Sequence, residues 1–300
     1  MGAIPVFADI ESDTFCIDPE SIKKNISPRT KAIMAIDIFG QSCDMNRIIK
    51  IANENNLKII SDTAQSPGAK YFGKFAGTLG DIGGYSLNYH KHINTGEGGI
   101  LVTNNDSLAE RMRLIRNHAE AVISDKETQL NNMLGHNFRL GEIECAIGIE
   151  QIKKLNSLVT NRINIVQSLI NGLSGLRGLS LPKIREHSTH VFYILPMILN
   201  IEELDVSREE IVLALEAEGL DGLINGYANI HLLPMYQKKI AYGSKGFPWN
   251  SPFCKREISY DKGICPVAEE LNDKTFISFE MCLYELNDDD INLIINAFNK

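Results

Sequence analysis

The sequence predicts an α/β fold, in which a large domain with a mostly parallel sheet is followed by a smaller α+β domain at the carboxyl end. Two observations predict this fold. Over the first half of the 300 residues, short apolar runs alternate with helical stretches, as in parallel strands joined by crossover helices. After a long helical stretch near the middle of the chain this alternation stops, and capped helices and one strand follow. We therefore expect two domains, at residues 1–155 and 156–300.

Five apolar runs predict the strands of the first half. They are Pro5–Ile10, Ala32–Ile38, Leu57–Ile60, Gly84–Leu87 and Gly99–Thr103. A first helix is expected at Pro19–Lys24, because Asp18 is a good helix cap and proline fits the first helical position. Amphipathic patterns predict two further helices, at Met45–Asn55 and Leu108–His118.

The second half predicts three helices and one strand. Glu142 to about Leu173 reads as one long helix with isoleucine and leucine at helical spacing, and His190–Leu199 reads as a strand. Ser207 and Glu210 form a capping box, which indicates the start of a helix. Asn287 precedes a final amphipathic helix and is expected to cap it.

Composition excludes several classes of protein. No apolar run is long enough for a transmembrane helix, and 44% hydrophobic residues suffice for a substantial core. A net charge of −8 disfavours nucleic acid as a partner, since nucleic acid requires a basic face. The six cysteines are scattered and include no Cys-x-x-Cys pair, which argues against a zinc site and disulfides and suits a reducing compartment. We expect a soluble, cytoplasmic protein that holds no metal and binds neither nucleic acid nor membranes.

Two polar segments carry the residue types that pyridoxal 5′-phosphate (PLP) chemistry requires. Asp62 follows the apolar run Leu57–Ile60, and Lys91 lies in a polar, glycine-rich stretch between two further strand-like runs. In an open α/β sheet ligands bind beyond the carboxyl ends of the strands, so these two side chains can converge there. A lysine amine can bond the PLP aldehyde, and a carboxylate can keep the pyridine nitrogen protonated so that the ring accepts electrons.

The segments Ser61–Ala69 and Ser86–Gly99 resemble the signature of the DegT/DnrJ/EryC1/StrS family, whose members are PLP-dependent aminotransferases acting on nucleotide-linked keto-sugars. The resemblance extends over nearly the whole chain. It implies a PLP-dependent transferase fold of type I. It also implies amino transfer from L-glutamate to a nucleotide-linked keto-sugar, as in amino-sugar biosynthesis for a surface polysaccharide or a secondary metabolite. A homodimer with shared active sites is implied as well.

The resemblance assigns roles to individual residues. Lys91 would hold the cofactor covalently, and Asp62 would pair with its pyridine nitrogen. Gln65 resembles a glutamine near the phenolic oxygen of the cofactor, and Ser86 resembles a serine that binds its phosphate. Asn137 lies in a Gly-His-Asn-Phe-Arg-Leu stretch and resembles an asparagine that reaches the phosphate of a neighbouring subunit.

Four further residues have less specific surroundings. His231 lies in an Asn-Ile-His-Leu-Leu-Pro stretch similar to one near the family's sugar-nucleotide site, and a structural core residue fits this position equally well. Asp37 replaces a histidine that is common in the family. His90 and His92 flank Lys91 and read as ordinary polar loop residues.

Two alternatives remain open. Sugar dehydratases of this family carry a histidine in place of the lysine, and Lys91 argues against that activity. The chain opens almost at once on an apolar run, whereas the family carries an upstream segment with a Ser-Gly-Thr loop at the cofactor phosphate. We therefore expect an amino-terminally shortened member that binds PLP weakly. The alternative function is a non-catalytic or fragmentary member without a complete phosphate site.

Overall fold

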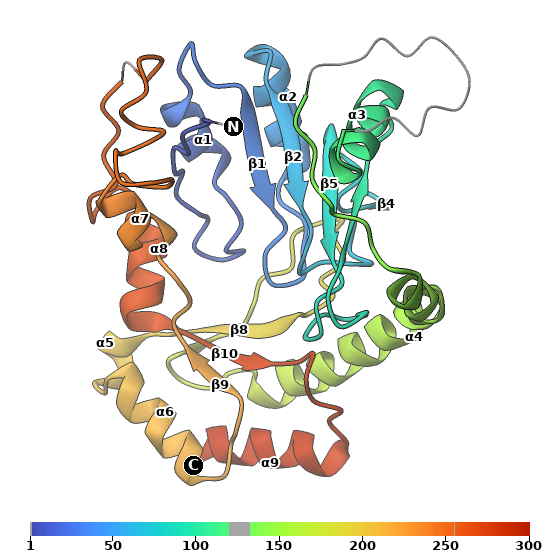
Figure 1. Ribbon diagram of the computed structural model, residues 1–300. Helices are drawn as coiled ribbons and strands as arrows, with labels where there is room; N and C mark the ends of the chain where they lie inside the picture. The colour runs from blue at the N-terminus through green and yellow to red at the C-terminus, as the bar shows by residue number, and fades with distance from the viewer. Residues whose placement is uncertain (1, 120–132, 255) are drawn as a thin grey trace. The chain divides into compact units, whose positions relative to one another are not determined.

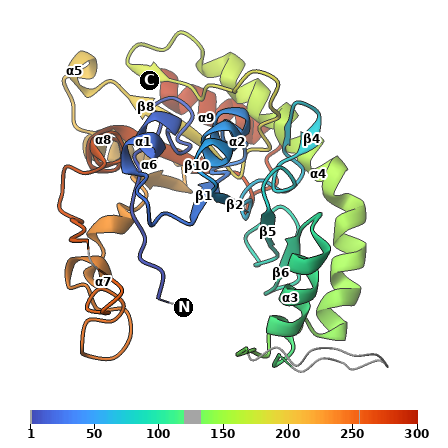
Figure 2. The same cartoon turned by 90° about the horizontal axis from the view of Figure 1, so that it is seen from above.

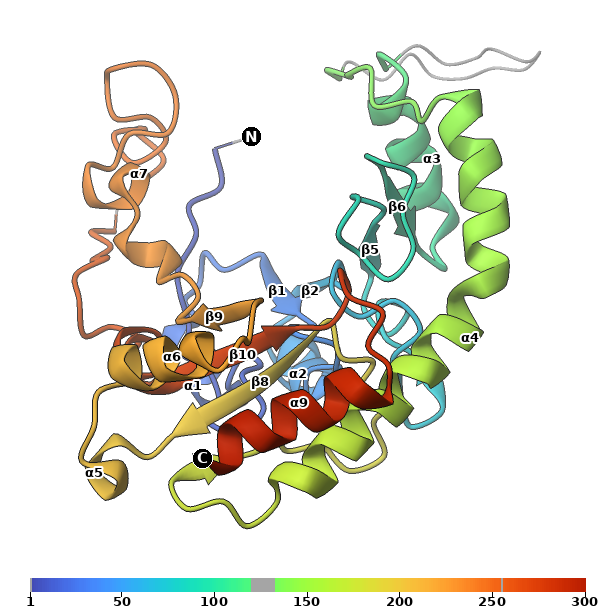
Figure 3. The ribbon, with the colours of Figure 1, turned by 90° about the horizontal axis from the view of Figure 1, so that it is seen from below.

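A computed structural model describes residues 2–119, 133–254 and 256–300, and its ribbon is shown from three sides in Figures 1 to 3. Contacts divide the chain into two units. Unit 1 comprises Met1–Thr30, Ile163–Arg185 and Ile194–Lys300, and unit 2 comprises Lys31–Arg162 and Glu186–Tyr193. The expected boundary between residues 155 and 156 stays a prediction.

Unit 2 contains a four-stranded sheet in the order β1-β2-β5-β6 (Figure 2). Its strands are β1 (Ala32–Ile36), β2 (Lys58–Asp62), β5 (Ile82–Ser86) and β6 (Gly99–Val102). The pairs β1–β2 and β2–β5 are parallel, and only β6 runs antiparallel to its neighbour β5. The prediction of a mostly parallel sheet is confirmed, and four of the five predicted runs each overlap one strand of this sheet.

Helices flank this sheet along the chain. The helix α2 (Met45–Glu54) connects β1 to β2 and buries one apolar face, on which Ile48 and Ile51 are almost fully covered. The helix α3 (Asp106–Arg116) follows β6, and α4 (Glu142–Leu173) has the predicted bounds. Two strands too short for a periodic signal, β3 (Lys70–Tyr71) and β4 (Lys74–Phe75), pair as a small hairpin.

Unit 1 contains a second sheet of four strands, in the order β7-β8-β10-β9, with every pair antiparallel. Its strands are β7 (Leu179–Ser180), β8 (Ile194–Leu199), β9 (Leu223–Asn225) and β10 (Phe276–Glu280). Nearly every residue of β8 and β10 is buried, so these two strands form the core of the unit. The helices α6 and α9 lie on one face of this sheet (Figures 1 and 3).

The α-helices and shorter helical turns of unit 1 account for the capping signals in the sequence. They are α1 (Pro19–Asn25), α5 (Ile201–Leu204), α6 (Arg208–Ala217), η1 (Ile230–Leu232), α7 (Pro234–Gln237), α8 (Pro266–Glu270), η2 (Leu271–Thr275) and α9 (Asp288–Asn299). Asp18 caps α1, Ser207 opens α6 in a complete capping box, and Asn287 caps α9. None of the helices among the described residues has an apolar stretch of the length that a membrane crossing needs.

Two strand predictions are wrong in part or in full. Pro5–Ile10 forms no strand, and among the described residues its only ladder contact is an isolated bridge between Ile10 and Ile17. The strand predicted at His190–Leu199 begins only at Ile194. Phe192 has a φ of 48°, which interrupts an extended strand, because this left-handed conformation is incompatible with a β ladder.

Candidate active site

Asp62 closes β2 at the carboxyl edge of the parallel strands. The register places it opposite Ile36 of β1 on one side and Gly84 of β5 on the other. Its Oδ1 accepts a hydrogen bond from the amide of Ala64 at 3.1 Å, which starts a tight turn. The side chain is half-buried, and Oδ2 accepts no hydrogen bond from any residue that the structure describes. One carboxylate oxygen is therefore open to a ligand.

Ser86 closes the neighbouring strand β5 and begins the loop that leads to β6. Its hydroxyl oxygen accepts a hydrogen bond from the amide of Asn88 at 3.2 Å, and the hydroxyl hydrogen remains available to a ligand. Two backbone bonds close the loop at its base, from Leu87 to the carbonyl of Gly98 at 2.9 Å and from Thr95 to the carbonyl of Leu87 at 3.0 Å. A Cβ at position 98 would lie 2.8 Å from Thr95 Oγ1, so this tight closure requires glycine.

Lys91 lies in this loop and is half-buried. Its amide donates to the carbonyl of Asn88 at 3.0 Å, and its Nζ lies 4.4 Å from the ring centre of Tyr193. That distance is within the range of a cation–π interaction. Tyr193 precedes β8 and belongs to the same unit. No sequence motif indicates Tyr193, because an isolated tyrosine far along the chain has no spacing relation to Lys91.

The histidine beside Lys91 is a buried anchor, which corrects the interpretation of His92 as an ordinary polar loop residue. His92 is buried, and its Nε2 lies 2.9 Å from the carbonyl oxygen of Val191. Burial, together with the charge of Arg162, lowers the pKa of His92 to about 3. Burial likewise lowers the pKa of His190 to about 3. Both rings are therefore neutral at neutral pH, and His92 ties the Lys91 loop to the Val191 segment.

Gln65 lies in the turn that Asp62 begins. Its Oε1 accepts a hydrogen bond from the amide of Phe39 at 2.8 Å, which links this turn to the segment that follows β1. Asp62, Gln65 and Ser86 thus all lie at or just beyond the carboxyl ends of adjacent parallel strands, and Lys91 lies on the loop after Ser86.

Asn137 and His231 do not lie in the segments that follow these two strands. Asn137 pairs with Asn117 in an isolated bridge, and its side chain is exposed. His231 belongs to unit 1, where it is buried with its Nε2 2.8 Å from Oε1 of Glu269. Glu269 also accepts hydrogen bonds from the amide of Gly263. These contacts are those of a core residue, and a substrate contact for His231 stays a prediction.

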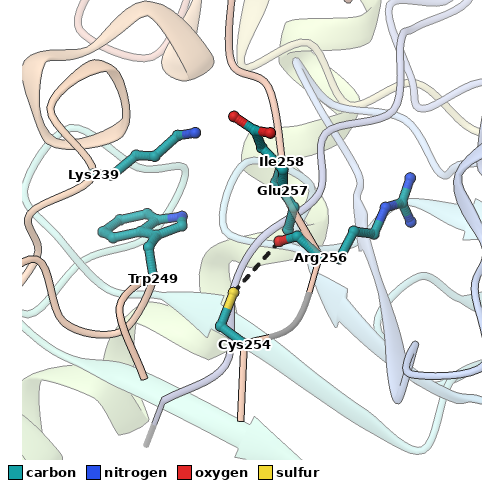
Figure 4. Close-up of a pocket in the computed structure, with 6 residues that line it drawn as sticks. All are labelled: Lys239, Trp249, Cys254, Arg256, Glu257 and Ile258. Carbon is teal, nitrogen blue, oxygen red and sulfur yellow. Dashed lines mark hydrogen bonds between the residues drawn. The ribbon is translucent and has the colours of Figure 1, made fainter. Parts of the chain in front are cut away.

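Unit 1 also has a surface pocket of about 350 Å³ that no sequence motif indicated (Figure 4). It is lined by Lys239, Trp249, Cys254, Arg256, Glu257 and Ile258. The close-up shows Lys239 and Trp249 on one side and Arg256 on the other, and the Cys254 thiol donates to the carbonyl of Arg256 at 3.6 Å. None of the predicted site residues lines this pocket.

Comparison with known proteins identifies the family. A model of the DegT/DnrJ/EryC1/StrS aminotransferase family matches residues 1–275. The chain belongs to this family. Its members are PLP-dependent nucleotide-sugar aminotransferases with the type I fold, and the predicted family, fold and cofactor class are thereby confirmed.

Individual relatives span more residues than this chain. GDP-perosamine synthase from Caulobacter vibrioides is 34% identical over 236 residues, which are 78% of this chain and 62% of that protein. The spore coat polysaccharide biosynthesis protein SpsC from Bacillus subtilis is 29% identical over 265 residues, or 86% of this chain and 68% of that protein. The crystal structure of DesV from S. venezuelae matches with a TM-score of 0.80 at 26% identity, covering 98% of this chain and 70% of DesV.

Proposed function

We propose that this chain transfers an amino group from L-glutamate to a nucleotide-linked keto-sugar. The observation that carries the proposal is the position of Asp62, whose open carboxylate oxygen lies at the carboxyl end of β2, next to the strand that leads through Ser86 to Lys91. The names of two relatives, a GDP-perosamine synthase and a polysaccharide biosynthesis protein, support a sugar substrate and a product used in a polysaccharide.

The residues present fit PLP. Asp62 Oδ2 can accept a hydrogen bond from a protonated pyridine nitrogen, and the Ser86 hydroxyl can donate to a phosphate oxygen. Lys91 supplies the primary amine that a covalent bond to the cofactor requires. Gln65, in the turn that begins at Asp62, would contact the phenolic oxygen of the ring.

Bound PLP would supply an aldehyde that receives the amino group and an aromatic ring that takes up electrons. Lys91 would hold the cofactor through Nζ, give up that position to the incoming amine and then move a proton from the α-carbon of the donor. Asp62 would keep the pyridine nitrogen protonated. The ring of Tyr193 would hold the Lys91 ammonium group whenever the amine is not bonded to the cofactor.

We further propose a homodimer with shared active sites. The exposed side chain of Asn137 supports this proposal, because it is available to the phosphate of a second copy. In the same way His231 is proposed to contact the nucleotide-sugar, and residues 1–155 are proposed as the cofactor-binding domain. A cytoplasmic location is supported by the six cysteines, all of which are free thiols.

The proposal is tested by trapping the cofactor. Protein mixed with PLP and reduced with borohydride should carry the label on Lys91, and Lys91→Ala should lose both the label and amino transfer while its unfolding temperature stays unchanged. Exposed Lys183 gives a matched control, since Lys183→Ala should keep both. Peptide mapping that finds the label on another lysine would contradict the assignment.

A substrate screen then identifies the reaction. GDP-, dTDP- and UDP-linked keto-sugars are supplied with L-glutamate, L-glutamine or L-aspartate, and L-glutamate is expected to be consumed only when a keto-sugar is present. Labelling of Lys91 without turnover on any of these sugars would favour the alternative, a non-catalytic member of the family.

A further inference from the structure

Asp37 directly follows β1 and is buried, with 1% of its surface exposed. Its amide donates to the carbonyl of Asp62 at 2.8 Å, and its own carbonyl accepts a hydrogen bond from the Ser66 hydroxyl at 2.6 Å. Both partners belong to the segment Asp62–Ser66 that follows β2. The backbone of Asp37 therefore holds this segment at its first and its last residue.

The carboxylate of Asp37 adds a third connection. Its Oδ2 accepts a hydrogen bond from the Thr63 hydroxyl at 2.7 Å, and its Oδ1 accepts one from the amide of Cys43 at 2.9 Å. Thr63 and Cys43 are fully buried. Because leaving a buried donor without an acceptor is destabilising, these bonds favour one arrangement of the segment. The Cys43 bond ties the segment to the chain just before α2.

We propose that Asp37 is a positioning residue that fixes the segment Asp62–Ser66, and through it the carboxylate of Asp62 and the amide of Gln65. The proposal rests on the proposed function, since it concerns the two side chains that would contact the PLP ring. Displacing a catalytic group by about 1 Å can reduce the rate about a hundredfold, so small movements of this segment matter. In the sequence, Asp37 is notable only as a replacement for a histidine that is common in the family.

The first test uses the cofactor-free protein and measures hydrogen exchange at the amides of Ala64 and Ser66. Thr63→Val removes the hydroxyl that donates to Asp37, and exchange at these amides should accelerate about tenfold or more. Thr63→Ser keeps a hydroxyl and should exchange at the wild-type rate. Thr14→Val is the matched control, because Thr14 is also buried and also donates to a carboxylate, that of Glu11, in unit 1. It should leave both amides unchanged.

A second variant covers the case in which Thr63→Val does not fold. Ser66→Ala removes only the hydrogen bond to the carbonyl of Asp37, and exchange at Ala64 should accelerate in this variant too. Wild-type exchange in every variant that folds would overturn the proposal. Because this measurement needs no cofactor, its outcome is independent of whether the proposed function is correct.

The second test asks whether the segment positions Asp62 for the reaction. In Thr63→Val, kcat should fall about tenfold to a hundredfold with little change in KM for L-glutamate, and the visible absorbance band of bound PLP should titrate at a different pH. Thr63→Ser should restore both values. Unchanged kcat and absorbance in Thr63→Val, with faster exchange, would show that the segment moves without affecting Asp62 and would overturn the proposal. Failure of the wild-type protein to label at Lys91 would instead count against the proposed function.

Discussion

At the scale of single residues, surroundings decide function more than residue type does. Asp37 and Asp62 lie at the ends of adjacent strands and are joined by a backbone hydrogen bond of 2.8 Å, yet they have opposite surroundings. Asp37 is buried and has hydrogen-bond donors at both oxygens, whereas Asp62 is half-buried and keeps one oxygen open. The first is suited to hold structure and the second to hold a ligand.

Replacing Asp62 by Asn should reduce amino transfer on the order of a hundredfold or more, because an amide cannot stabilise a protonated pyridine nitrogen. The Lys91 label should persist, since the amine is unchanged. Steady-state kinetics with L-glutamate measure the loss. Asp13→Asn is the control, because that carboxylate is partly exposed in a surface ion pair with Lys183. Near-normal kcat in Asp62→Asn would remove Asp62 from the site.

Asp37 should give the protein a stability that falls as pH rises. Burial raises the pKa of Asp37 from 3.8 to about 6, so the folded state keeps a proton that the unfolded state has already lost. The folded state is then favoured below pH 4, and this contribution of about 3 kcal/mol is lost as pH rises through 6. Tyr85, which faces this carboxylate, has a raised pKa and does not titrate in this interval.

Urea unfolding at pH 4, 5 and 7 tests this dependence. In Asp37→Asn the contribution is absent, so the stability of the variant relative to the wild type should increase by about 2.4 kcal/mol from pH 4 to pH 7. Asp44→Asn, at the cap of α2, provides a comparison in the same unit. A difference between wild type and Asp37→Asn that stays constant with pH would contradict the prediction.

The residues that sequence could identify are those with local motifs. Lys91 and Asp62 lie in short segments with distinctive neighbours. As predicted, Asp62 ends a strand and Lys91 lies in the polar stretch between two strands. The contact of Tyr193 and the role of Asp37 could not be predicted from the sequence, because each depends on a contact between segments far apart in the chain. No spacing rule in a single sequence encodes such a contact.

At the scale of elements, capping and periodicity located the helices better than apolar runs located the strands. The bounds of α4 were predicted, and Ser207 and Asn287 begin α6 and α9. The strand β10 was missed although it lies between β8 and β9, because five residues without alternation resemble any buried segment. Pro5–Ile10 was overpredicted for the same reason.

The capping box of α6 should contribute measurably to stability. Ser207 Oγ accepts a hydrogen bond from the Glu210 amide at 3.3 Å, and Glu210 reaches back to the amide of Ser207 at 3.1 Å. Ser207→Ala should lower the free energy of unfolding by about 1 kcal/mol. Ser107→Ala, at an exposed position inside α3, should have no effect beyond a few tenths of a kcal/mol. Equal unfolding midpoints in the two variants would contradict the assigned cap.

At the scale of the whole molecule, contacts between distant segments decide which residues form a unit. The expected division after residue 155 follows chain order, whereas unit 1 includes residues 1–30 together with most of the second half. Asp9 shows why, since its carboxylate accepts hydrogen bonds from the amides of Val267 at 2.9 Å and Ala268 at 3.0 Å in the first turn of α8. A carboxylate at a helix amino terminus is stabilising. No local pattern in the sequence predicts this contact between Asp9 and α8.

Unit 2 should lose stability in acid because two of its histidines are buried. His92 and His190 are neutral in the folded state, with pKa values lowered from 6.5 to about 3, whereas in the unfolded chain both gain a proton below pH 6.5. Their contribution to stability is therefore present above pH 6.5 and is lost as pH falls toward 3. At pH 5 each histidine should lower the free energy of unfolding by about 2 kcal/mol. Asp37 should raise it by about 1.4 kcal/mol at the same pH.

Unfolding of the protein by urea at pH 7 and pH 5, followed by a probe in unit 2, measures this loss. His92→Gln keeps a donor for the Val191 carbonyl, and His190→Asn keeps an acceptor for the Phe192 amide, so both variants can preserve the packing. Between pH 7 and pH 5, the free energy of unfolding of each variant should fall by about 2 kcal/mol less than that of the wild type. His118→Gln, at an exposed position, is the control and should fall as much as the wild type. If the variants at His92 and His190 showed the same pH dependence of stability as the wild type, other groups would take up the protons. The two neutral histidines would then not account for the acid sensitivity of unit 2.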